Sequence, residues 1–102
     1  MTLKPGSRWR SAVCSAEAVV VRPAKEPLVL ECGGQPMLAP GDDRPDGLTP
    51  APDHADGVQV GKRYFDAETG IEVLCSKAGA GSLSVGGRPL ARKDAKALPA
   101  SD

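Results

Sequence analysis

The chain has few aromatic residues, no long apolar run and no excess of charge of either sign. Among its 102 residues only Trp9, Tyr64 and Phe65 are aromatic, and 13 basic side chains balance 13 acidic ones. A balanced charge lacks the electrostatic attraction that nucleic acids and anionic membranes require. The longest apolar stretches, such as Ala18–Val21, are too short to span a bilayer. We therefore expect neither a nucleic-acid partner nor a membrane.

Cysteine is also scarce, and its count is odd. The three residues are Cys14, Cys32 and Cys75. No apolar segment of signal-peptide length follows Met1, so nothing predicts export, and we expect a cytoplasmic protein. In that compartment a structural disulfide framework is unusual, which leaves free thiols or metal ligands as the ordinary roles of cysteine.

Glycine and proline, by contrast, are abundant. The chain has 12 glycines and 10 prolines, which excludes a helical bundle and favours a small all-β fold with many turns. Strand-forming residues occupy Val19–Val21 and Leu28–Leu30. Gly33–Gly34 and Gly86–Gly87 suit tight turns with positive φ, and Asp66–Gly70 predicts another turn with Gly70 at positive φ.

An internal repeat relates the two halves of the chain. Each half opens with glycine, two residues and an aromatic residue, at Gly6–Trp9 and at Gly61–Tyr64. Each closes with Gly-Gly, one residue, proline and an apolar residue, at Gly33–Met37 and at Gly86–Leu90. The first copy is two residues longer, which an insertion around Pro23–Pro27 explains. Two landmarks at nearly equal spacing favour a duplication.

The repeat divides the chain into four parts. Residues 1–38 form the first copy and residues 58–92 the second. Residues 39–57 contain four prolines, three glycines and five aspartates but little apolar content, so we interpret them as a linker. Residues 93–102 are expected to be a flexible or partner-docked tail, in which residues 94–98 could form one loose turn.

The repeated unit resembles a known small iron-binding module. The pattern of Gly-x-x-aromatic, a knuckle-like turn, a β-hairpin and a second Gly-rich turn is similar to the desulforedoxin-like module, a relative of rubredoxin. In that family CxxC follows the aromatic residue, Cys-Cys-Gly forms the second turn, and four thiolates bind one iron. The resemblance implies two β-hairpin modules fused into a pseudo-twofold tandem, the single-chain counterpart of the family's homodimer.

This chain departs from the family at the ligand positions. The four positions of the first copy fall on Ser11, Cys14, Cys32 and Gly33. Those of the second copy fall on Asp66, Thr69, Val85 and Gly86. The resemblance therefore implies that neither copy alone holds a four-thiolate iron, so no metal ligand is firmly assigned. The candidates that remain are Cys14, Cys32 and Ser11.

The resemblance would place Cys14 and Cys32 close together, and three roles are open to this pair. In the first role they are a remnant pair, either two buried thiols or a disulfide that forms under oxidising conditions. Alternatively, they bind iron or zinc together with Ser11, with His54 or with a ligand from another chain. A redox-active or catalytic thiol is the third role, although neither cysteine has a histidine or lysine at a spacing that would activate it.

The remaining chemistry-bearing residues have structural interpretations. Cys75 falls within a predicted strand, Ile71–Ser76, and is expected to be a small buried apolar residue. His54 lies between Asp53 and Asp56 in the linker and is expected to be solvated.

A scaffold that has lost its metal needs another source of stability. Packing of the two copies, a bond between Cys14 and Cys32, or docking on a larger protein could supply it. We therefore predict a small non-catalytic interaction or accessory subunit with a larger partner protein, with homo-oligomerisation as a further option. No catalytic or cofactor-binding residues are expected. The alternative is a metal-binding or electron-transfer protein that holds one iron or zinc ion at Cys14 and Cys32.

Overall fold

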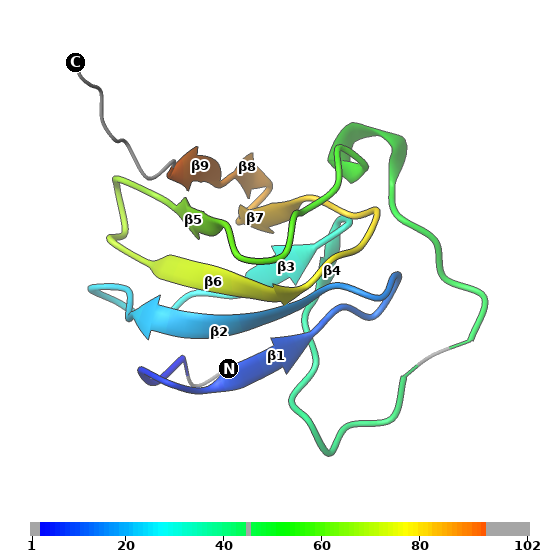
Figure 1. Ribbon diagram of the computed structural model, residues 1–102, viewed down its shortest axis with the longest axis horizontal. Helices are drawn as coiled ribbons and strands as arrows, with labels where there is room; N and C mark the ends of the chain where they lie inside the picture. The colour runs from blue at the N-terminus through cyan, green and yellow to red at the C-terminus, as the bar shows by residue number, and fades with distance from the viewer. Residues whose placement is uncertain (1–2, 45, 94–102) are drawn as a thin grey trace.

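The computed structural model describes residues 3–44 and 46–93, in which nine short strands form two antiparallel sheets (Figure 1). One sheet has the order β1-β2-β6-β5-β9 and the other the order β4-β3-β7-β8. The strands are β1 Arg8–Arg10, β2 Glu17–Arg22, β3 Leu30–Cys32, β4 Gln35–Pro36, β5 Arg63–Phe65, β6 Glu72–Lys77, β7 Leu83–Val85, β8 Arg88–Pro89 and β9 Ala91–Lys93. The predicted all-β class is confirmed. Within the described ranges, no helix has the length and apolar character needed to cross a bilayer.

Strands β2 and β6 pair at the centre of the five-stranded sheet because both carry alternating apolar residues. Ala18 and Val20 of β2 are buried, as are Val73 and Cys75 of β6. The β-branched side chains favour the extended backbone, and the alternation places the buried ones on one face. The sequence prediction that Cys75 is a small buried residue within a strand is confirmed.

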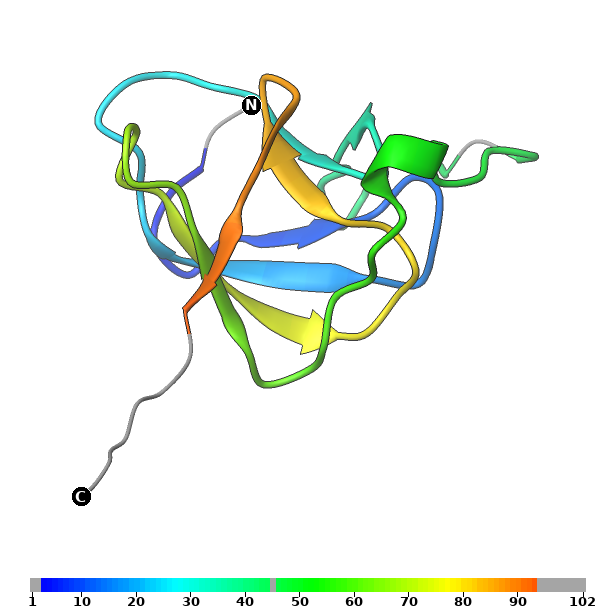
Figure 2. The same ribbon diagram turned by 90° about the horizontal axis from the view of Figure 1, so that it is seen from above.

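The core lies between the two sheets (Figures 1 and 2). Leu30 and Cys32 of β3 and Leu83 and Val85 of β7 pack in one cluster with the inner residues of β2 and β6. Trp9 and Tyr64 join the same cluster and are 9% and 8% exposed. Few residues are large, so the core depends on close packing of valine, leucine, alanine and cysteine.

Apart from the edge strand β9, the strand orders are unchanged when the two halves of the chain are exchanged. In the central pair Ala18 lies opposite Cys75 and Val20 opposite Val73, with the pair Val19–Leu74 between them. The four-stranded sheet behaves in the same way. Its central pairings are Leu30 with Val85, Glu31 with Ser84 and Cys32 with Leu83.

The outer pairings follow the same exchange. Trp9 pairs with Ala18 as Tyr64 pairs with Val73. An isolated bridge between Arg10 and Leu38 occupies the place that the β5–β9 pairing has in the second half. After Leu38 the chain continues as the loop that leads to the 3-10 turn at Pro52–His54. At the equivalent place in the second half it continues as strand β9.

The glycine turns have the backbone that the sequence predicts. Gly33 and Gly34 have φ of 65° and 88°, Gly86 and Gly87 have φ of 56° and 80°, and Gly70 has φ of 81°. At Gly33 a Cβ atom would also collide with the side chain of Val13. The first glycine pair is therefore required both for its backbone conformation and for the close approach of the neighbouring turn.

The segment between the repeats is partly packed rather than fully solvated. The N–H of Ala51 donates to the carbonyl of Gly33 at 2.9 Å, and the N–H of Ser82 donates to the carbonyl of His54 at 2.8 Å. A short 3-10 turn, Pro52–His54, lies between these contacts. His54 is half buried, so its interpretation as a solvated residue is wrong.

The last strand extends past the boundary predicted between the second copy and the tail. Strand β9 reaches Lys93, one residue into the segment interpreted as a tail. Residues 94–102, including the turn expected at 94–98, lie outside the described residues.

Candidate functional site

The structure brings Ser11, Cys14 and Cys32 together in the first half. The sulfur atoms of Cys14 and Cys32 are 3.9 Å apart, and the sulfur of Cys14 lies 3.3 Å from the hydroxyl oxygen of Ser11. Ser11 and Cys14 belong to the turn between β1 and β2, and Cys32 ends strand β3. Cys14 is partly exposed, whereas Cys32 is fully buried. The two thiols therefore differ in access to solvent.

The hydroxyl of Ser11 organises the turn that carries Cys14. Its oxygen accepts the N–H groups of Val13 and Cys14, each at 3.1 Å. A hydroxyl oxygen has two lone pairs and one proton. The thiol of Cys14 donates to the same oxygen at 3.3 Å, and the Ser11 hydroxyl beside the sulfur favours the thiolate form and acts to lower the pKa of Cys14.

A loop from the second half of the chain covers the two sulfur atoms. The N–H of Gly81 donates to the sulfur of Cys14 at 3.4 Å. A Cβ atom at Gly79 would lie 2.8 Å from that sulfur, and one at Gly81 would lie 3.1 Å from the sulfur of Cys32. The hydroxyl of Ser15 donates to the carbonyl of Ala78 at 2.8 Å and anchors the same loop. The dithiol site is thus built from both halves of the chain.

The surroundings shift the pKa values of the two thiols in opposite directions. Burial acts to raise the pKa of Cys14, but hydrogen bonds from Ser11 and from the backbone of Ala16 and Gly81 outweigh it, so the pKa falls below its ordinary value. Burial raises the pKa of Cys32 to about 12, and the neighbouring sulfur of Cys14 adds to the shift. Cys14 is therefore the more acidic and the more accessible thiol.

The donor set does not fit a four-thiolate iron centre. Two thiolates on one tetrahedral ion, each about 2.3 Å from it, stand about 3.8 Å apart, so Cys14 and Cys32 fit one edge of a tetrahedron. The other two family positions carry the hydroxyl of Ser11 and no side chain at Gly33. Across residues 3–44 and 46–93, no three His, Cys, Asp or Glu side chains gather as a metal site.

His54 lies near this region, but within the described residues no hydrogen bond joins its ring to either sulfur. Its ring packs near Gly34, where a Cβ atom would lie 3.5 Å from Cδ2 of the imidazole. Its Nδ1 atom is buried without a hydrogen-bond partner. The structure thus gives His54 a packing role beside the Gly33–Gly34 turn.

The corresponding place in the second half holds an ion pair. Asp66, which is buried, accepts two hydrogen bonds from Thr69, from its N–H at 3.1 Å and its hydroxyl at 2.7 Å. Arg88 approaches the same carboxylate from strand β8. Val85 is part of the core, and Gly86 begins the following turn. Charge and hydrogen bonding therefore hold this turn in the described structure.

The guanidinium of Arg88 lowers the pKa of Asp66. Its hydrogen bonds lower the pKa of the carboxyl well below the ordinary range, and those of Thr69 act in the same direction. Sequence patterns did not reveal this pair, because Asp66 begins the β5–β6 turn while Arg88 lies in strand β8, and only the fold brings them together.

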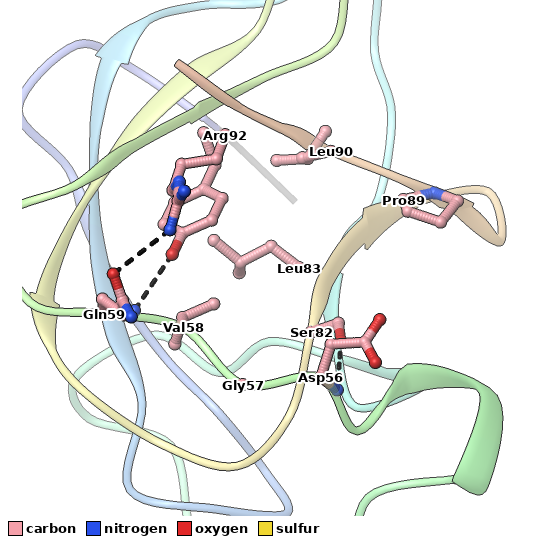
Figure 3. Close-up of a pocket in the computed structure, with 10 residues that line it drawn as sticks. Asp56, Gly57, Val58, Gln59, Ser82, Leu83, Pro89, Leu90 and Arg92 are labelled. Atoms are coloured by element: carbon pink, nitrogen blue, oxygen red, sulfur yellow. Dashed lines mark hydrogen bonds between the residues drawn. The ribbon is translucent and has the colours of Figure 1, made fainter. Parts of the chain in front are cut away.

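A pocket of about 400 Å³ lies on the second half, beside strands β8 and β9 (Figure 3). In this view Val58 and Leu83 lie between the side chains of Arg92 and Asp56, which mark its two ends. Leu90 and the aromatic ring of Tyr64 add apolar surface to the lining. The pocket therefore combines an apolar floor with one basic and one acidic end.

Hydrogen bonds hold the walls of this pocket. The N–H of Gln59 donates to the hydroxyl of Tyr64 at 3.0 Å, and Arg92 donates to the side-chain oxygen of Gln59 at 3.3 Å. The N–H of Asp56 donates to the hydroxyl of Ser82 at 2.8 Å. The lining comes from four separate segments, so no local sequence pattern could have predicted it.

Comparison of the chain with protein families, with curated proteins and with solved structures finds no match.

Proposed function

We propose that the chain is a small non-catalytic accessory protein that binds a larger protein through the pocket beside β8 and β9. The observation that carries this proposal is the composition of the pocket. Apolar side chains at Val58, Leu83 and Leu90 line it, while Asp56 and Arg92 are exposed at its ends. Such a site suits an apolar side chain of a partner's extended segment, which the two charges orient.

The proposal includes a desulforedoxin-like origin for the scaffold. It is supported by the exchange relation of the strand pairings and by the gathering of Ser11, Cys14 and Cys32 at one turn. In the second half the pair Asp66–Arg88 takes the place that a metal has in the family. A scaffold that packing and an ion pair stabilise does not need iron to fold. We propose that its function is to bind a partner protein.

Two variants and a control test the binding proposal in the full-length chain. Arg92→Glu and Asp56→Lys reverse the exposed charges at the ends of the pocket. Lys62→Glu changes an exposed charge outside the pocket lining. The wild-type chain is used to isolate and identify its partner from the source cells, and the affinity of that purified partner is then measured for each variant.

We expect the two pocket variants to lose about tenfold or more in affinity, while Lys62→Glu keeps the wild-type value. Equal affinity for all four proteins would contradict the proposal. Recovery of the native chain as a lone monomer would also contradict it. Sedimentation of the purified chain shows whether the partner is a second copy, which is the homo-oligomer option.

Metal binding is the second candidate, and one distance favours it. The separation of 3.9 Å between the sulfurs of Cys14 and Cys32 suits two thiolates on a single zinc or iron ion, with Ser11 beside them. The test is elemental analysis of the purified chain. About one ion per chain, lost in Cys14→Ala and retained in Cys75→Ala, would favour this function over the first.

A further inference from the structure

The dithiol site contains two cysteines of unequal access, with their sulfur atoms in contact. Cys14 is partly exposed at a turn, and Cys32 is fully buried behind it. The sulfurs, 3.9 Å apart, are close enough that a bond of about 2.05 Å requires them to approach by about 1.9 Å. The third cysteine, Cys75, is also fully buried and donates from its thiol to the carbonyl of Lys77 at 3.2 Å. Only one thiol of the pair is therefore open to a reagent.

We propose that Cys14 and Cys32 are a reversible dithiol–disulfide site that exchanges with low-molecular-weight disulfides, with Cys14 as the entry point. The ligand class is a small aliphatic disulfide, of which oxidised glutathione is the probe. The two cysteines are not among the residues that line the pocket, and the test of this proposal does not require a bound partner.

The exchange has two steps that balance. The thiolate of Cys14 attacks one sulfur of the small disulfide, whose S–S bond breaks, and one small thiolate leaves and takes a proton from water. The thiol of Cys32 then gives its proton to solvent or to the leaving group and attacks the sulfur of Cys14. The protein disulfide forms, and the second small thiol leaves. Two protein thiols are oxidised, and one small disulfide is reduced to two thiols.

The fold determines the order of these steps. Cys32 has no exposed surface, so a reagent from solvent reaches Cys14 first. The N–H of Gly81 and the hydroxyl of Ser11 both face the sulfur of Cys14 and stabilise negative charge on it. Once Cys14 carries the mixed disulfide, Cys32 is already in contact with the sulfur that it must attack. The buried thiol thus acts as the resolving group.

The test treats the metal-free, full-length chain with oxidised glutathione and maps the products by mass spectrometry. The wild-type chain is expected to lose two hydrogens, with a peptide linkage between Cys14 and Cys32 and a free thiol at Cys75. A dithiol reductant is expected to restore the original mass. Cys75→Ala serves as the matched control and is expected to form the same linkage.

Two further variants separate the steps. Cys32→Ala should stop at the mixed disulfide on Cys14, and Cys14→Ala should gain neither adduct nor linkage. Circular dichroism verifies the fold of each variant, and the wild-type mapping stands even if one of them fails to fold. A glutathione adduct that persists on the wild-type chain, a linkage through Cys75, or native thiols that resist oxidised glutathione would each overturn the proposal.

Discussion

The guanidinium of Arg88 contacts the carboxylate of Asp66 through two hydrogen bonds, from Nε to Oδ1 at 3.0 Å and from Nη2 to Oδ2 at 2.8 Å. The carboxylate is buried, whereas the arginine is partly exposed at 43%. Thr69 donates to the same carboxylate from its N–H and hydroxyl groups. One acidic side chain therefore joins the β5–β6 turn to strand β8.

This pair predicts a dependence of stability on acid pH. The pKa of Asp66 in the folded chain lies below its ordinary value of 3.8, chiefly because of Arg88. Its stabilising contribution is therefore complete above that value and is lost as the pH falls toward the folded-state pKa. We expect Asp66→Asn to lower the melting temperature at pH 7 and to flatten its fall below about pH 4. Glu68→Gln removes only the longer, 3.8 Å contact of Arg88 with a side chain that is 75% exposed, so this control should stay close to the wild-type profile.

The thiols predict a selective alkylation. Cys14 should react with iodoacetamide faster than the other cysteines, with a midpoint below the ordinary pKa of 9.0, whereas Cys32 should stay unreactive in the native chain. Ser11→Ala removes the hydroxyl beside the sulfur, so the midpoint should move upward and the rate at neutral pH should fall several-fold. Peptide mapping after timed alkylation measures both. An unchanged midpoint in Ser11→Ala would exclude this role for the hydroxyl.

The loop over the sulfurs predicts a steric effect at Gly81. A Cβ atom there would lie 3.0 Å from the backbone of Gly33 and 3.1 Å from the sulfur of Cys32. We expect Gly81→Ala to lower the free energy of unfolding by about 1–3 kcal/mol, as overpacking does. Gly41 has open space around its Cβ position, so Gly41→Ala should change it by less than about 0.5 kcal/mol. Urea unfolding of both variants checks the difference, and equal stability would contradict the packing described.

Oxidation of the pair predicts a gain in stability. A bond between Cys14 and Cys32 closes a loop over residues 15–31, and closure of a loop of that length restricts the unfolded chain by about 2–3 kcal/mol. The oxidised chain should therefore unfold at higher urea concentration than the reduced chain. Cys32→Ala should show no such difference between oxidising and reducing conditions. A lower midpoint for the oxidised chain would mean that the bond distorts the folded turn.

The sequence predicts the elements better than it predicts their contacts. The all-β class followed from the turn glycines and the apolar residues near Val20, and the positive φ of Gly70 followed from its place in the turn. The strand burial of Cys75 followed from the apolar neighbours around it. Each of these depends on residues close together in the chain, where backbone preference decides the structure.

Contacts between distant segments were not predictable in the same way. The pair Asp66–Arg88 forms where strand β8 approaches the β5–β6 turn within the second half, whereas the contact of Gly81 with Cys14 forms where the two halves pack against each other. His54 was misinterpreted for the same reason, because its linker neighbours are polar while its ring packs beside a turn of the first half. Spacing and composition carry no information on such approaches.

The loop over the sulfurs continues directly into Ser82, a residue of the pocket lining. The N–H of Val58 donates to the carbonyl of Gly79 at 3.0 Å, and the hydroxyl of Ser82 accepts the N–H of Asp56. A single stretch of backbone, residues 79–82, therefore contacts the sulfur of Cys14 at one point and lines the pocket at another. By thermodynamic reciprocity, any guest that displaces this stretch must change the reduction potential of the thiols, and their oxidation must change the affinity for the guest by the same factor.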